Sequence, residues 1–166
     1  MLNITSSEAW WFAPFVLPIC YWAALSDLRH MKIPNKAVLA LTGVFMVIGL
    51  IALPSFVDYG WRLLHLLVML IIGIGFNSAG FIGAGDAKFI AAAAPFVLLS
   101  DLALVSLILA ANLLAGLATH RMAKHSPLRK LAPDWKSWTS EGKFPMGVSL
   151  GATLAIYMVM GVVFGG

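Results

Sequence analysis

Charged residues are scarce in this sequence. Asp, Glu, Lys and Arg together make up 11% of its 166 residues, and 61% of the residues are hydrophobic. A soluble domain carries roughly 25% charged residues, so a water-soluble globular protein is excluded. Intrinsic disorder is excluded as well, because it requires low hydrophobicity and high charge. The low charge and high hydrophobicity therefore indicate an integral membrane protein.

The sequence also lacks a second cysteine and segments in which apolar and polar residues alternate. Its one cysteine, Cys20, lies inside an apolar run, so an internal disulfide, a cysteine zinc site and a CxxC redox pair are all excluded. The apolar runs are unbroken, whereas the strands of an outer-membrane barrel alternate apolar and polar residues. No glycine fingerprint for a nucleotide on a βαβ unit is present. The chain is therefore expected to be all-α, and we predict neither a metal, nor a cofactor, nor a nucleic-acid partner.

Long apolar runs are what the sequence has instead. Charges or Pro/Gly clusters separate six of them: 9–26, 37–53, 61–79, 89–100, 102–118 and 144–164. A membrane-crossing helix needs about 20 mostly apolar residues, so we predict six transmembrane helices in a single domain, 1–166. The first Lys or Arg is Arg29, after the first run. A cleaved signal peptide needs basic residues before its apolar run, so the first helix is expected to be an anchor with its N-terminus outside.

The positions of the basic residues support this topology. Three segments that would share one side, 27–36, 83–88 and 120–143, hold ten of the 11 Lys and Arg residues, and only Arg62 falls on the other side. Basic loops face the cytoplasm, which predicts a multi-pass protein of the inner (cytoplasmic) membrane. The weak point is the short fourth run. Fusing it with the fifth into one tilted helix would move 120–143 outside, so the charges favour a turn at 100–101, with Asp101 capping the fifth helix.

Two acidic residues stand at the inner ends of apolar runs. Asp27 follows the first run, and Asp86 follows the third in the sequence GAGD. A carboxylate at the edge of the hydrocarbon is costly and suggests a functional site. Two carboxyl groups that share one proton could activate a water and protonate a carbonyl. Helix capping by each acid, and tight packing by Gly83 and Gly85, remain alternatives from the residues alone. The other acids are assigned to loops or turns: Glu8, Asp58, Asp101, Asp134 and Glu141.

Three motifs resemble one family. The stretch 27–35, DLRHMKIPN, resembles the first signature of type IV prepilin peptidases, an Asp followed by Ile-Pro-Asn, and 83–89, GAGDAKF, resembles their second, GxGDxK. The later stretch 144–148, FPMGV, looks like the Pro-aromatic-Gly opening of the family's last helix, with Met146 where an aromatic is common. The chain thus resembles the GxGD membrane aspartic peptidases.

The resemblance implies both a reaction and a substrate. Asp27 and Asp86 would be the catalytic pair. The substrate would be a prepilin whose basic leader is removed at the cytoplasmic face of the bilayer, leaving its apolar helix. The sequence lacks the zinc-binding CxxC insert of larger members, so it is similar to the short peptidases of tight-adherence (Flp) pilus systems, and methyltransferase activity is not expected.

Lesser roles and rival functions remain open. Lys88 could stabilise Asp86 or contact substrate, or simply anchor the loop to the inner face. Pro34 and Asn35 are expected to start the second helix, with Asn35 as its cap. A small transporter or channel subunit would also use intramembrane acids, but no inverted repeat is visible. A non-catalytic pilus-assembly protein is the other alternative. The oligomeric state is not predicted.

Overall fold

The computed structural model describes residues 2–140 and 144–166 of the chain. Two residues considered above, Glu141 and the basic Lys143, lie outside this range. The described residues form six α-helices joined by short turns and 3-10 helices. The α-helices are α1 (Ser6–His30), α2 (Asn35–Ala52), α3 (Phe56–Ser78), α4 (Ala84–Ala93), α5 (Leu102–Lys124) and α6 (Met146–Phe164). The 3-10 helices are η1 (Ala94–Phe96), η2 (Leu99–Asp101), η3 (Pro127–Leu131) and η4 (Lys136–Trp138).

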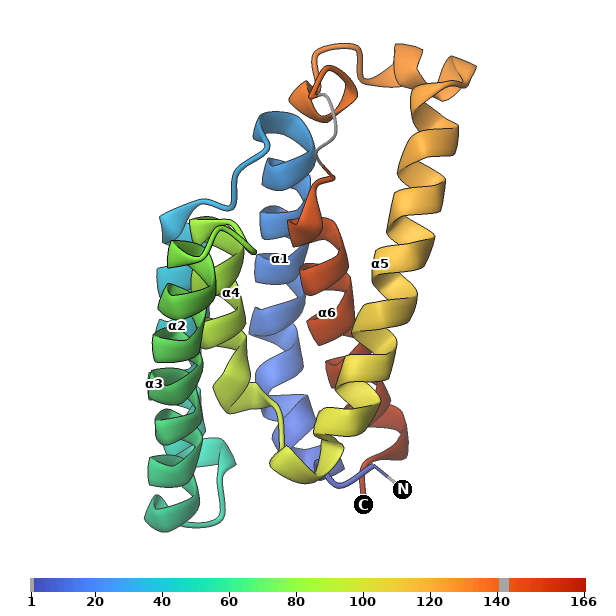
Figure 1. Cartoon of the computed structure of the whole chain (residues 1–166). Helices are drawn as coiled ribbons and strands as arrows, with labels where there is room; N and C mark the ends of the chain where they lie inside the picture. The colour runs from blue at the N-terminus through green and yellow to red at the C-terminus, as the bar shows by residue number, and fades with distance from the viewer. Residues whose placement is uncertain (1, 141–143) are drawn as a thin grey trace.

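The helices run up and down along one direction. Figure 1 shows both termini at one end of the molecule, together with the α2–α3 connection and η2. The α1–α2 and α3–α4 connections and the η3–η4 segment lie at the opposite end. We call the first the terminal end and the second the site end. This arrangement agrees with the predicted up-and-down topology.

Five of the six helices, all except α4, are long and apolar enough to cross a membrane. Helix α4 has 10 residues, or about 15 Å at 1.5 Å per residue. Pro95 falls in η1 directly after it, and proline has no N–H with which to continue a helix. The prediction of a sixth transmembrane helix over 89–100 is therefore wrong, because this run is divided among α4, η1 and η2. The alternative in which the fourth and fifth apolar runs form one long helix is also wrong, because α4 and α5 run in opposite directions (Figure 1).

The core is built on α1, which packs along α6 on one side and against α2 on the other, while α4 packs against α2, α3 and α6 (Figure 1). The α1–α6 contact is close, since a Cβ on Gly151 would stand 2.8 Å from the carbonyl oxygen of Cys20. Toward α2 and η1, the rings of Phe12 and Phe45 both pack edge-on to Phe96. Most of α5 is not covered by other helices, and none of its residues is buried.

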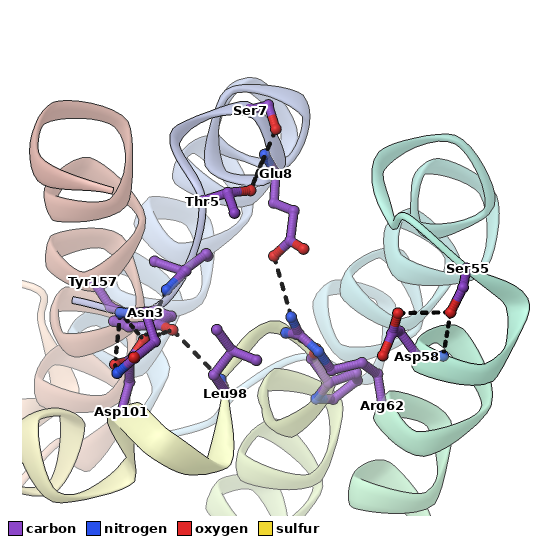
Figure 2. A network of polar contacts seen from close by, with 12 residues as sticks. Asn3, Thr5, Ser7, Glu8, Ser55, Asp58, Arg62, Leu98, Asp101 and Tyr157 are labelled. Carbon is purple, nitrogen blue, oxygen red and sulfur yellow. Dashed lines mark hydrogen bonds and ion pairs between the residues drawn. The ribbon is translucent and has the colours of Figure 1, made fainter. Parts of the chain in front are cut away.

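A buried carboxylate holds the terminal end together (Figure 2). Asp101 is 2% exposed and accepts hydrogen bonds from the backbone N–H groups of Asn3 and Ile4 and from the Tyr157 hydroxyl, at 2.9, 3.0 and 2.9 Å. Its side chain makes no capping hydrogen bond to α5, so the predicted cap is wrong. The acid instead ties the N-terminal segment to α6.

A second buried pair lies nearby (Figure 2). Arg62 of α3 donates to Glu8 of α1 at 3.1 Å, and it also donates to the carbonyl oxygen of Pro95 at 3.2 Å. Both side chains are less than a tenth exposed. The sequence predicts Glu8 in a loop, but the residue lies in the first turn of α1, where the helix dipole favours an acid. The one basic residue predicted on the outer side is thus neutralised inside the protein.

Candidate active site

Asp27 lies in the last turn of α1 and points at the start of α6. The residue is 6% exposed, and its Oδ2 accepts the backbone N–H of Gly147 at 2.7 Å. Gly147 is in the first turn of α6, where N–H groups have no partner within the helix and the helix dipole favours a negative charge. A Cβ at position 147 would lie 3.0 Å from both Cβ and Oδ2 of Asp27. Only glycine therefore gives the carboxylate this close access.

Asp86 lies in the first turn of α4, three residues after the capping residue Gly83. An acid at this position can reach back to the backbone N–H of the capping residue, and Asp86 accepts such a bond from Gly83. A Cβ on Gly83 would stand 2.8 Å from Oδ2 of Asp86. The spacing of the GxGD motif thus places the carboxyl group so close to Gly83 that a side chain there would force the Asp86 carboxylate to shift.

The two carboxyl groups influence each other. The pKa of Asp86 is raised from 3.8 to about 6, chiefly by burial and in addition by the negative charge of Asp27, while the Gly83 hydrogen bond opposes both. Asp86 lies outside the five long spans. A carboxyl group with such a pKa keeps its proton well above the pH at which an ordinary aspartate loses it.

Ile33 links the elements that carry the two acids. It lies in the short α1–α2 connection and is 4% exposed. Its Cδ1 would be 3.0 Å from a Cβ on Gly147, and its own Cβ 3.5 Å from one on Gly85. The connection therefore packs between α6 and α4. The two signature stretches and the start of α6 meet at the site end.

Lys88 and Asn35 meet at the same place. The Lys88 ammonium donates to the Asn35 side-chain oxygen, with 3.4 Å between Nζ and Oδ1. Pro34 occupies the capping position of α2 and Asn35 its first turn, with no side-chain cap, so the predicted cap by Asn35 is wrong. Among the described residues, Arg62 and Glu8 form an ion pair, whereas Lys88 and Asp86 do not. The role of Lys88 stays a prediction.

Two residues of the site were missed from the sequence. Gly147 was noted only as part of a family-like motif, and Ile33 only as part of Ile-Pro-Asn. The available signal was a glycine two residues after the helix-starting Pro145, where the backbone N–H has no partner within the helix, but nothing in the sequence pairs it with Asp27. Among the described residues, no group of three His, Cys, Asp or Glu side chains could hold a metal ion.

Comparison with protein families identifies the family of this chain. Residues 15–119 match the family model described as type IV leader peptidase family. The chain belongs to this family. The matched range contains both Asp27 and Asp86, whereas Gly147 lies beyond it. The predicted resemblance is thus confirmed. Searches among curated proteins and solved structures gave no match.

Family membership fixes the class of the protein. Type IV leader peptidases are aspartic-type prepilin peptidases, and the predicted enzyme class is thereby confirmed. The site offers two groups that such chemistry needs, since one carboxyl group accepts an N–H at a helix N-terminus and the pKa of a second carboxyl group close by is raised to about 6. Membership also argues against a transporter or channel subunit.

Proposed function

We propose that this type IV leader peptidase cleaves the basic leader from a prepilin at the cytoplasmic face of the membrane, with Asp27 and Asp86 as its catalytic pair. The observation that carries the proposal is the convergence of the two acids. They come from helices 59 residues apart in the sequence, yet the charge of Asp27 raises the pKa of Asp86. Such electrostatic coupling of two carboxyl groups is what allows them to share one proton.

The contacts of the two acids suggest their roles. Asp27 accepts an N–H at the start of α6, which fixes the direction of its carboxyl group, and in this proposal it acts as the base toward a bound water. Asp86, whose pKa is raised to about 6, carries the proton that the pair shares and donates it to the carbonyl oxygen of the scissile bond. The water oxygen attacks the carbonyl carbon, and the C–N bond breaks as a proton returns to the leaving amine.

The bilayer explains how substrate reaches this pair. The charges indicate that the site end faces the cytoplasm, so a prepilin with its apolar helix in the membrane presents its leader junction at the level of the two acids. Lys88 and Asn35, which are joined by a hydrogen bond beside Asp86, are placed to contact the leader junction. Localisation in the inner membrane is part of this proposal.

Replacement of each acid by its amide tests the proposal. Asp27→Asn and Asp86→Asn keep the shape of the side chain and remove its acid chemistry, so each should abolish leader cleavage of a co-expressed prepilin while the protein still inserts into the membrane. Asp134→Asn is the matched control, because Asp134 is an exposed acid in the segment between α5 and α6. It should cleave at the wild-type rate. Chelators should leave the purified wild-type enzyme unaffected.

The same experiment separates the peptidase from a pilus-assembly protein without activity. If both amide variants process prepilin normally, Asp27 and Asp86 are not the catalytic pair. If the purified wild-type protein cleaves no prepilin while the variants still support pilus assembly, the non-catalytic function replaces the proposed one.

A further inference from the structure

An apolar groove of about 570 Å³ lies between α3, α4, α5 and α6. Its floor includes Phe89 of α4 and Leu150 of α6, both buried, and its α3 and α5 walls include Val68 and Leu102. The few polar side chains along it include Ser106 of α5. The proposed chemistry does not use this groove.

The groove continues the faces that carry the catalytic site. On α4, Asp86 is followed at helical spacing by two groove residues, Ile90 and Ala93. On α6, Gly147, which binds Asp27, is followed at the same kind of spacing by Leu150 and Leu154. Residues three, four and seven apart share one face of a helix. The groove therefore begins about one turn below the two acids and leads away from them toward the terminal end.

The groove is open to the bilayer at its side. Helix α5 packs along α6 and stands apart from α3 and α4 (Figure 1), and the groove fills the space that this leaves. Wall residues on both sides are partly uncovered, with Val68 43% and Leu102 51% exposed. An occupant could enter from the lipid without passing through water.

The size of the groove suits a short length of helix. Its lining residues span Trp61 to Met69 on α3 and Leu102 to Leu109 on α5, or about 12 and 10 Å at 1.5 Å per residue. That length corresponds to about two helical turns. The walls of the groove are almost wholly apolar, so the groove is not suited to a charged lipid headgroup.

We propose that this groove binds the first turns of the substrate's own apolar helix. The inference rests on the proposed function, in which the cleaved bond lies at Asp27 and Asp86 and the apolar helix follows it. The substrate chain that follows the scissile bond would run past one turn of α4 and then reach the groove directly. The groove thus sets which residue of the substrate reaches the acids, so the substrate is selected by its helix as well as by its leader.

Filling the groove tests this assignment. Ser106 is exposed to the groove, so Ser106→Phe places a ring in it without disturbing the core. The substrates are a fusion of a lysine-rich leader ending in glycine to a 20-residue Leu/Ala helix, and a peptide that stops four residues after the glycine. Ser106→Phe should raise KM for the fusion by about tenfold and leave cleavage of the short peptide unchanged.

The control variant is Ala111→Phe. Ala111 is an exposed residue of α5 that does not line the groove, and it should cleave both substrates at the wild-type rate. Equal KM for the fusion in Ser106→Phe and wild type, or equal slowing of both substrates, overturns the groove assignment. Cleavage of neither substrate by the wild type overturns the proposed function instead.

Cross-linking gives a second readout that needs no enzyme variant. A benzophenone placed about eight residues after the cleavage site, two helical turns on, should cross-link the wild-type enzyme at α3 and α5. Cross-links confined to lipid, or to the outward face of α5 around Ala111, would show that the groove holds lipid while substrate binds elsewhere.

Discussion

Asp27 and Gly147 are 120 residues apart in the chain and share one hydrogen bond. The glycine contributes a backbone N–H that has no partner within helix α6, and the absence of a side chain leaves room for the carboxylate. A methyl group at position 147 would press on Asp27 and on Ile33 together, at 3.0 Å from each. The geometry of the proposed base therefore depends on a residue outside both signature motifs.

Gly147→Ala should lower kcat because the added methyl group displaces the Asp27 carboxylate. A shift of about 1 Å in a catalytic group costs up to about a hundredfold in rate, and we expect a loss of about tenfold to a hundredfold in leader cleavage. KM for a prepilin should change little. Steady-state kinetics of the purified variant measure both values.

Gly75→Ala is the matched control for this substitution. Gly75 lies in α3, and a Cβ there meets nothing within 4 Å. Alanine is the better helix former, so this variant should be at least as stable as wild type and fully active. Wild-type kcat in Gly147→Ala would contradict the role assigned to the glycine.

At single positions, the sequence was informative where a motif was involved. Asp27 and Asp86 could be predicted because each ends an apolar run within a family-like signature. Gly147 could not be assigned, because its partner lies at the far end of the chain and only packing of α1 on α6 brings the two together. Asp101 and Glu8 were misplaced for the same reason, since their partners, Asn3, Tyr157 and Arg62, come from other elements.

Among the elements, five helices follow from hydropathy alone. The fourth run was more difficult, because its apolar residues extend past the point where Pro95 ends helix α4. Hydropathy reports burial in a nonpolar medium but not where a helix breaks. The charge distribution nevertheless predicted a reversal of direction before α5, and the structure contains that reversal (Figure 1).

The packing of α1, α3 and η1 against one another depends on the Glu8–Arg62 ion pair. Removing one member of a buried ion pair leaves an uncompensated charge and costs about 3 kcal/mol or more. Glu8→Gln and Arg62→Met should each lower the thermal midpoint of the protein in detergent, and the double variant should lose less than the sum of the two. A double-mutant cycle measures the coupling.

Asp58→Asn serves as the control for this cycle. Asp58 is an exposed acid in the first turn of α3, and its replacement should cost much less than either change in the pair. Strict additivity of Glu8→Gln and Arg62→Met would indicate that the two side chains do not stabilise this packing through each other.

Across the whole molecule, charge is divided between the two ends. Described basic residues such as Lys32, Lys88 and Lys136 lie at the site end, in the α1–α2 connection, the first half of α4 and η4, while Arg62 toward the terminal end is buried against Glu8. The positive-inside rule acts on exposed loop charges, so the internal pairing of Arg62 removes the one exception in the sequence. The site end should therefore lie in the cytoplasm and the termini outside.

Labelling of single cysteines tests this orientation. In a Cys20→Ala background, an impermeant maleimide applied to intact cells should label cysteines placed at Ser55 and Ser100 and should label those at Phe81 and Thr139 only after the cells are opened. All four positions are exposed. A cysteine at Leu114, 72% exposed on the middle of α5, should resist labelling in both cases because lipid covers it. Labelling of 139 but not 81 in intact cells would place the two site-end connections on opposite faces, and the acids could then not meet as one site at the cytoplasmic surface.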